Sequence, residues 1–294
     1  MKILLTGGSG FIGRNIIEQL GSKYHILAPR HKELDLLNED DVRSFFQSHS
    51  IDVVIHSAVK PGHRNSADNS QLCYNNLRMF YNLARNEDFF DKMIFLSSGA
   101  AYDVSKDLLK VREEDFDTNV PGDEHGFSKY ISAKYVEKSE KITELRLFGI
   151  FGKYEDYSIR FISNVICKAL YNIPISIKQN RKFDYVYIDD FITILDSFIS
   201  ERYQYKVYNV TPDQSIELYE IAKMVLNIIG ENLPINVASP GLGKEYSGAN
   251  DRLQKELKDK GICFSSLNES IRKLVEWYKQ NVHEIDRQLL LFDK

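Results

Sequence analysis

The sequence predicts an α/β protein built on a doubly wound parallel sheet, followed by a smaller mixed α/β lobe. Short apolar runs alternate with segments of helical periodicity through the first half of the chain, a pattern typical of a parallel sheet covered on both faces. Past residue 152 this alternation loosens. We therefore expect residues 1–152 to form the sheet domain and 153–294 the lobe, with 182–212 returning to the sheet domain.

Each element is expected from its local pattern. The strands of the sheet are predicted at Lys2–Thr6, Tyr24–Ala28, Asp52–Ser57, Met93–Ser98 and Glu144–Phe151. Helices are expected where apolar residues recur three and four positions apart, and Asn38 is placed to cap the second of these helices. In the lobe we expect helices at Ser158–Tyr171, Leu218–Ile229 and Leu267–Gln280, and strands at Ile173–Lys178 and Phe183–Ile188.

The composition narrows the class of protein. A net charge of -4 offers no long-range attraction to nucleic acid phosphates, so no nucleic acid partner is expected. No uncharged apolar stretch approaches the ~18–20 residues that span a bilayer, and the first residues lack a signal peptide's pattern, so we expect a cytoplasmic protein without a membrane partner. Cys73, Cys167 and Cys263 are widely spaced and odd in number, which favours buried free thiols over disulfides or a metal site.

The most informative segment is a glycine turn between the first strand and the first helix. Gly7 allows the tight turn, Gly10 lets the backbone approach a pyrophosphate, and Gly13 lets the helix pack closely on the strand. The free amides that open the helix, at Phe11 and Ile12, would hold the phosphates together with the helix dipole. The position of the turn within a βαβ pattern predicts a dinucleotide site.

The choice of dinucleotide depends on the end of the second strand. An NAD site usually carries an acidic residue there, which binds the ribose 2′-hydroxyl. Here Ala28 is followed by Pro29, Arg30, His31 and Lys32, and Arg30 can grip a 2′-phosphate with two parallel hydrogen bonds. We therefore expect NADP(H), with NAD as the alternative if this loop is merely a solvated basic turn.

Several segments together carry a resemblance to a known family. The G-x-x-G-x-x-G spacing is followed, in order, by the segments Ile55–Gly62, Phe95–Tyr102, Leu145–Gly152, Phe183–Asp190 and Leu267–Tyr278. In this order they resemble the extended short-chain dehydrogenase/reductases of the NAD-dependent epimerase/dehydratase family, nearest the nucleotide-sugar 4-ketoreductases and GDP-fucose synthases. The resemblance implies a Rossmann-type fold, a nucleotide-sugar substrate and a homodimer. It also places Ala58 and Lys60 near the cofactor's ribose.

The resemblance also implies the catalytic residues. The family uses a Tyr as acid/base, a Lys four residues later that holds the nicotinamide ribose, and a Ser that bonds the reacting oxygen. Ser98 matches the Ser, and Lys129 matches the Lys in a segment where His125 stands at the position of the Tyr. A second Tyr-x-x-x-Lys pair, Tyr130 and Lys134, lies five residues later.

Three interpretations of His125 stay open at this stage. The imidazole acts as the acid/base, or the substitution removes activity and leaves binding intact, or Tyr130 is the true donor. Toward the substrate, Arg160 and Arg181 are candidate contacts. Gly99 and Ala100 stand where the family's dehydratases carry an acidic pair, and Ala100 stands where GDP-fucose synthases carry a Cys, which argues against dehydration and 3,5-epimerisation.

The leading hypothesis is therefore an NADP(H)-dependent reductase of a 4-keto nucleotide sugar. The first alternative is a nucleotide-sugar 4-epimerase that retains NAD. The second is a protein that binds the dinucleotide and the sugar nucleotide without catalysis, because His125 replaces the family's Tyr.

Overall fold

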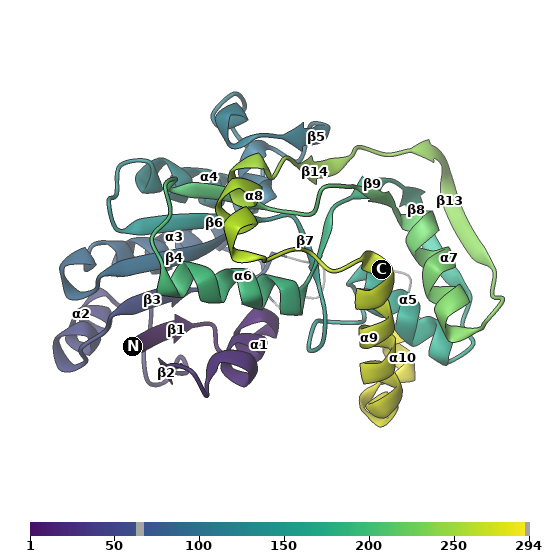
Figure 1. Cartoon of the computed structure of the whole chain (residues 1–294), viewed down its shortest axis with the longest axis horizontal. Coiled ribbons are helices and arrows are strands. Elements are labelled where there is room, and N and C mark those ends of the chain that lie inside the picture. The colour runs from purple at the N-terminus through teal and green to yellow at the C-terminus, as the bar shows by residue number, and fades with distance from the viewer. Residues whose placement is uncertain (63–67, 292–294) are drawn as a thin grey trace.

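The computed structural model describes residues 1–62 and 68–291, and six parallel strands form its central sheet (Figure 1). The strand order is β11-β6-β4-β3-β1-β2, so β1 lies at the point where the order reverses, with β2 on one side and β3 on the other. This is the doubly wound, Rossmann-type arrangement that the sequence predicts. The strands are β1 (Lys2–Thr6), β2 (His25–Leu27), β3 (Val53–His56), β4 (Lys92–Ser98), β6 (Ile142–Leu147) and β11 (Val207–Val210).

Helices cover both faces of this sheet because alternate side chains of each strand point to opposite sides. Ile3 and Leu5 of β1 belong to the larger apolar core, together with residues of α1 and α6. Leu4 belongs to a second core with residues of α2, α3 and α4. These helices are α1 (Phe11–Leu20), α2 (Glu39–Ser48), α3 (Leu72–Ala84), α4 (Glu124–Val136) and α6 (Ile188–Ser200).

Local capping signals fix where helices begin. The Asn38 side chain accepts hydrogen bonds from the amides of Asp40 and Asp41 at 3.0 and 3.3 Å, as the sequence predicts for the start of α2. Ser266 and Glu269 form a reciprocal capping box at the start of α9 (Leu267–Gln280). Both α9 and α7 (Leu218–Ile229) have the predicted bounds.

The long strand expected over 144–151 is divided in two. β6 ends at Leu147, and after Phe148 the chain leaves the central sheet to pair with a different strand. Gly149 permits this, because a Cβ there would lie 2.2 Å from the carbonyl oxygen of Asp184. The segment expected over 183–188 is divided as well. The strands concerned are β7 (Gly149–Phe151), β9 (Lys182–Phe183) and β10 (Tyr185–Tyr187).

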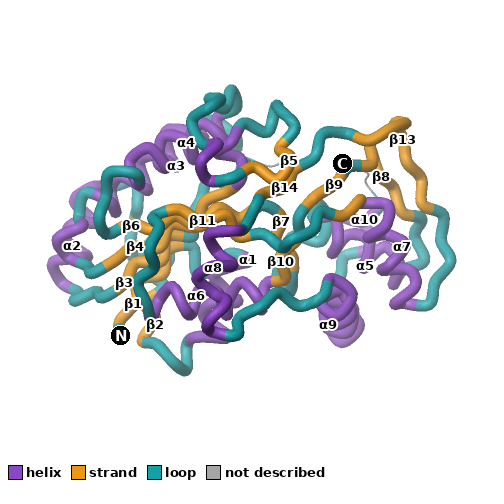
Figure 2. The backbone as a smooth tube through the Cα atoms, turned by 45° about the horizontal axis from the view of Figure 1, so that its top comes forward, coloured by secondary structure: helices purple, strands orange, loops and turns teal. Residues whose placement is uncertain are grey.

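The remaining elements build the lobe and join it to the sheet. The order β12-β9-β14-β5 forms a small sheet, and β13 pairs in parallel with β8. In Figure 2, β7, β10 and β14 lie between the central sheet and the lobe of α5 and α7. These elements are β5 (Leu108–Val111), α5 (Phe161–Leu170), β8 (Ile175–Asn180), β12 (Ile216–Glu217), β13 (Ile235–Leu242), β14 (Tyr246–Gly248), α8 (Asp251–Leu257) and α10 (Arg287–Leu290).

The structure bears on two further expectations from the sequence, the state of the cysteines and the absence of a membrane span. All three cysteines are free thiols, but only Cys167 is buried, while Cys73 is partly buried and Cys263 is exposed. The expectation of buried thiols is therefore wrong for Cys263, whose neighbours in sequence are apolar but do not cover it. Among residues 1–62 and 68–291, the helices are too short or too polar to cross a bilayer.

Candidate active site

The glycine turn lies at the carboxyl ends of β1 and β3, where the strand order reverses. Gly7 has a φ of +74°, and a Cβ there would lie 2.8 Å from the amide nitrogen of Ala58. Thr6 fixes the same edge, because its hydroxyl accepts hydrogen bonds from the amides of Ser57 and Ala58 at 3.2 and 3.1 Å. A ligand in the crevice outside these strand ends therefore meets backbone from both strands.

The start of α1 offers its first amides to such a ligand. The first helical hydrogen bond runs from Arg14 to the carbonyl of Gly10 at 2.9 Å, so the amides of residues 11–13 precede it. Gly13 must be glycine, because a Cβ would lie 2.2 Å from the carbonyl oxygen of Gly7. Phe11 and Ile12 are half-buried and pack against the larger core. The turn, its bare amides and the helix dipole fit a pyrophosphate.

The end of β2 borders the same turn. A Cβ on Gly8 would lie 2.8 Å from the Cβ of Ala28, so the glycine turn and the end of β2 are in direct contact. Arg30, two residues further on, is exposed, and its amide donates to Glu33 at 2.7 Å. Lys60 is engaged elsewhere, since its ammonium donates to Asp68 at 2.8 Å and also to a neighbouring backbone carbonyl.

Ser98 ends β4 and caps the short 3₁₀ turn η2 (Gly99–Tyr102) that follows it. Its hydroxyl accepts a hydrogen bond from the amide of Ala100 at 3.1 Å. It also shares a hydrogen bond of 3.3 Å with the hydroxyl of Tyr246, which belongs to β14. A Cβ on Gly99 would lie 2.7 Å from both that hydroxyl and the ring of Phe148, so the turn has no room for a side chain at this position.

The first turns of α4 pack against this 3₁₀ turn. A Cβ on Gly126 would lie 2.8 Å from the carbonyl oxygen of Ala100. Lys129 points toward the end of β4, where its ammonium donates to the carbonyl of Leu96 at 3.4 Å. Only 7% of Lys129 is exposed, and this burial lowers the pKa of its ammonium to about 8. The register that pairs position 125 with Lys129 therefore faces the end of β4.

His125 lies on the same side of α4, in a partly buried position. Burial first, and then the charges of Lys129 and Arg160, lower the pKa of the imidazole to about 4, against the opposing effect of Asp123. Its Nδ1 atom is buried without a hydrogen-bond partner among the described residues. The imidazole is therefore uncharged at neutral pH.

Tyr130 and Lys134 face a different direction. The Tyr130 hydroxyl donates to a carboxylate oxygen of Asp117, and the Lys134 ammonium binds the other oxygen at 3.0 Å. The Tyr130 ring lies 5.3 Å from the ring of Phe116. Five helical positions turn the side chain by about 500°, which separates this pair from His125 and Lys129. Lys129 thus reaches Leu96, two residues before Ser98 on β4, whereas Tyr130 binds Asp117.

A cleft of about 990 Å³ opens in the lobe between α5 and the β8–β13 pair. Lys168, Lys178 and Arg181 line it together with Phe183 and Leu218, so the cleft combines cations with apolar surface. Arg160 precedes α5 and is not among the lining residues, but it lies near enough to His125 to lower that pKa.

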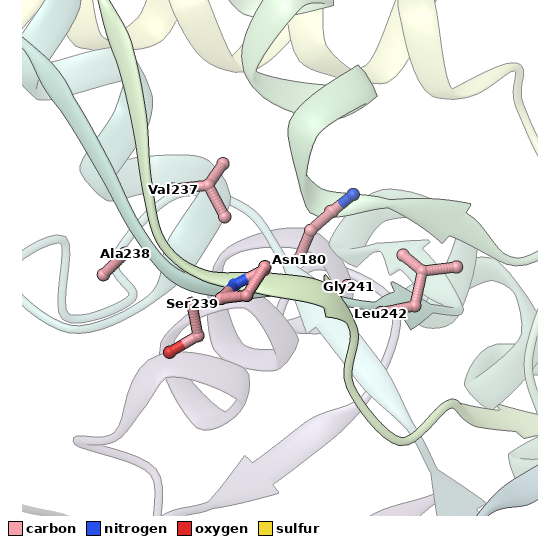
Figure 3. Close-up of a pocket in the computed structure, with 7 residues that line it drawn as sticks. Asn180, Val237, Ala238, Ser239, Gly241 and Leu242 are labelled. Carbon is pink, nitrogen blue, oxygen red and sulfur yellow. The ribbon is translucent and has the colours of Figure 1, made fainter.

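An adjoining hollow of about 480 Å³ lies along β13, and Figure 3 shows the residues that line it. It shares the segment 237–239 with the cleft, and Asn180 closes one side. The side chains that line the hollow carry no charge, so it has less to offer an anionic ligand than the neighbouring cleft.

Comparison with known proteins identifies the family. Residues 3–211 match the model described as the NAD dependent epimerase/dehydratase family. The chain belongs to this family. Membership confirms the predicted family and the nicotinamide dinucleotide class of cofactor, and it agrees with the glycine turn at the switch point of the sheet. The protein is an enzyme of the epimerase/dehydratase type.

Individual members of the family show how far the likeness extends. The chain is 25% identical to a putative UDP-glucose 4-epimerase from Methanocaldococcus jannaschii, over 95% of this chain and 99% of that one. It is 28% identical to the GDP-L-colitose synthase of Yersinia pseudotuberculosis over 58% of this chain and 60% of that one. A solved GDP-L-fucose synthetase from Naegleria fowleri, bound to NADP, shares the fold with a TM-score of 0.82 at 16% identity, covering 96% and 93% of the two chains.

One residue of this epimerase-family site was missed by the reasoning from sequence. Tyr246 lies 148 positions from Ser98 in the chain and reaches it only because β14 packs beside the 3₁₀ turn. Its segment, Tyr-Ser-Gly after a glycine-containing loop, carries no motif that marks a site. Only the folded arrangement of the lobe against the sheet reveals it.

Proposed function

We propose that this protein is an NADP(H)-dependent oxidoreductase that reduces the 4-keto group of a nucleotide-linked sugar. The observation that carries the proposal is the turn after Ser98. Gly99 and Ala100 are buried, and neither can move a proton. Dehydratases of the family need an acidic pair here and fucose synthases a Cys, so simple reduction is the chemistry that this turn favours.

The cofactor preference is proposed from the end of β2. Arg30 is exposed beside the glycine turn, where a guanidinium is well suited to a 2′-phosphate. Two proteins of similar fold support NADP. One is the Naegleria GDP-L-fucose synthetase, and the other is a GDP-mannoheptose C4 reductase from Campylobacter jejuni with NADP bound, which has a TM-score of 0.74 and 22% identity.

The cleft of the lobe is proposed as the sugar-nucleotide site. Lys178 and Arg181 provide positive charge for a diphosphate, and Phe183 provides an aromatic surface for a base or sugar. The relatives support this substrate class, since their names include a GDP-L-colitose synthase, a UDP-glucose 4-epimerase and a GDP-L-fucose synthase that is 35% identical over 34% of each chain. Arg160, near His125, would lie between the cleft and the reacting carbon.

The chain's own groups would bind and polarise the keto sugar. A bound dihydronicotinamide supplies the hydride that reduces the keto carbon. Ser98 would donate a hydrogen bond to the carbonyl oxygen, since its hydroxyl is already oriented by the amide of Ala100. Lys129 would hold the ribose hydroxyls and place positive charge where negative charge develops on that oxygen. The turn Gly99–Tyr102 is buried, which limits the access of water.

The test follows NADPH absorbance while purified protein is mixed with a panel of 4-keto nucleotide sugars across mildly acid to alkaline pH. We expect consumption with at least one of them, and a fall in kcat of roughly 10²–10³-fold for Ser98→Ala, which removes a donor to the developing oxyanion. Wild-type protein that consumes no NADPH with any of these sugars contradicts the proposal.

A second candidate function is a nucleotide-sugar 4-epimerase, favoured by the nearly full-length alignment with the putative UDP-glucose 4-epimerase. This enzyme would retain NAD through purification and interconvert two 4-hydroxy sugars without net cofactor consumption. If neither activity is found and both ligands bind, the binding-protein alternative applies. A large gain in turnover for His125→Tyr would then identify His125 as the cause of the missing activity.

A further inference from the structure

A tyrosine of the substrate lobe occupies the catalytic end of the sheet. Tyr246 belongs to β14, which pairs with β5 and β9, and its hydroxyl lies 3.3 Å from the hydroxyl of Ser98. Ser98 is the residue placed to bond the reacting oxygen. A second hydroxyl within hydrogen-bond distance of Ser98 is therefore placed to reach the same oxygen.

The surroundings of Tyr246 hold its ring in this position. The ring centroid lies 5.0 Å from that of Phe148 and 5.8 Å from that of Phe183. Glycines leave the room that this packing needs. A Cβ on Gly99 would lie 2.7 Å from the Tyr246 hydroxyl, and a Cβ on Gly248 would lie 2.6 Å from the Phe148 ring.

The other candidate donors near this turn are poorly suited to give up a proton. Tyr130 already donates to Asp117, and Tyr102 donates to the side-chain oxygen of Asn209 at 2.8 Å. The His125 imidazole, with a pKa of about 4, is almost entirely neutral at neutral pH, so very little of the more acidic imidazolium form is present to give up a proton.

Tyr246 stays protonated under the same conditions. Burial and the charge of Asp184 raise the pKa of its phenol to about 12, against the opposing effect of the hydrogen bond with Ser98. Asp184 is itself paired with the Lys110 ammonium at 3.1 Å. A phenol of this pKa remains a stronger acid than water, whose pKa is about 15.7, and so can protonate an alkoxide.

We propose that the Tyr246 hydroxyl is the proton donor of this site, in place of the tyrosine that His125 replaces. The inference rests on the function proposed above. As hydride from the dihydronicotinamide reaches the keto carbon, the cofactor is oxidised and the carbonyl π pair moves to oxygen. The Tyr246 O–H bond breaks, its proton joins that oxygen to form the alcohol, and the phenolate regains a proton from solvent.

The decisive variant is Tyr246→Phe, which keeps the ring that packs on Phe148 and removes only the hydroxyl. We expect kcat for reduction to fall at least 100-fold, since general acid catalysis contributes roughly 10²–10⁴-fold. The KM for the sugar and the Kd for NADPH should stay within about threefold. The matched control is Tyr171→Phe, whose hydroxyl donates to the carbonyl of Val282 at 3.1 Å, and it should retain full activity.

Two further measurements separate a catalytic from a structural role. A donor with the pKa of His125 makes the reduction rate fall tenfold per pH unit between about pH 5 and about pH 7, whereas Tyr246 keeps it level over that range. The second measurement is binding alone. Wild type should prefer the 4-hydroxy product over its 4-deoxy analogue, and Tyr246→Phe should weaken that preference at least threefold.

The outcomes distinguish this inference from the function on which it rests. If wild type reduces a keto sugar and Tyr246→Phe keeps more than about a third of its kcat, the inference is wrong and the proposed function stands. A rate that falls steeply from acid to neutral pH also overturns the inference. Wild type that binds the 4-hydroxy product but reduces none of the keto sugars overturns the proposed function, and the inference with it.

Discussion

Gly13→Ala is the sharpest test of the dinucleotide site, because two physical effects predict opposite signs. Alanine favours a helix over glycine by roughly 1 kcal/mol, so propensity alone predicts a more stable α1. The added Cβ would, however, lie 2.2 Å from the carbonyl oxygen of Gly7, whereas non-bonded heavy atoms need about 3.5 Å. The turn must therefore move by roughly 1 Å. Overpacking costs roughly 1–3 kcal/mol, so the clash at least cancels the gain.

Cofactor affinity is the more sensitive measurement for this variant. A shift of that size misaligns the amides of residues 11–13, and a hydrogen bond to a charged group contributes roughly 1.5–3 kcal/mol. We expect the Kd for NADPH, measured by calorimetry, to rise about tenfold to 100-fold. Gly122→Ala is the matched control, because a Cβ at Gly122 has no neighbour within 4 Å among the described residues. An NADPH affinity for Gly13→Ala within twofold of wild type would refute the reasoning.

Three further predictions concern single side chains. Lys129→Met should raise the free energy of unfolding of the cofactor-free protein by on the order of 3 kcal/mol below pH 8, because it removes a buried ammonium whose pKa is about 8 in the folded protein. Wild type should become more stable as the pH rises from about 8 to 10.5 and this ammonium loses its proton, so the difference in unfolding free energy between variant and wild type should shrink over that range. Urea titrations across pH measure this difference, and a difference that stays constant contradicts the prediction. Arg30→Glu should raise the Kd for NADPH at least tenfold and leave NADH binding unchanged, and equal effects on both cofactors would place Arg30 away from the 2′-phosphate. Tyr130→Phe removes the bond to Asp117 and should leave turnover within threefold of wild type; a large fall in kcat would show that the Tyr130–Lys134 register is the catalytic one.

Much of the sheet domain was predictable because its signals are local. The run Lys2–Thr6 is apolar on both faces, and β1 sends Ile3 and Leu5 to one core and Leu4 to the other. The Asn38 cap and the bounds of α7 and α9 depend on residues within one or two helical turns. Each of these features is encoded by neighbours in the chain, so periodicity and capping preferences suffice to find it.

The candidate site was predictable only in part. The sequence proposed two registers for the acid/base segment, and the choice between them depends on which face of α4 packs on the 3₁₀ turn. Gly126 against Ala100 and Lys129 against Leu96 decide this, and both partners are contributed by a different element. The division of the expected strand over 144–151 has the same kind of cause, since Gly149 turns toward a strand that starts at Tyr185.

By itself, the sequence determined the α/β class and the glycine turn that opens the first helix. It also offered the pairing of position 125 with Lys129 as one of two registers. The tertiary structure alone decided that Tyr130 turns to Asp117 and that Tyr246 meets Ser98. The physical reason is the separation along the chain of the residues that interact. Backbone conformation and capping are set by side chains a few positions apart, whereas the meeting of two hydroxyls 148 positions apart depends on how the lobe packs against the sheet.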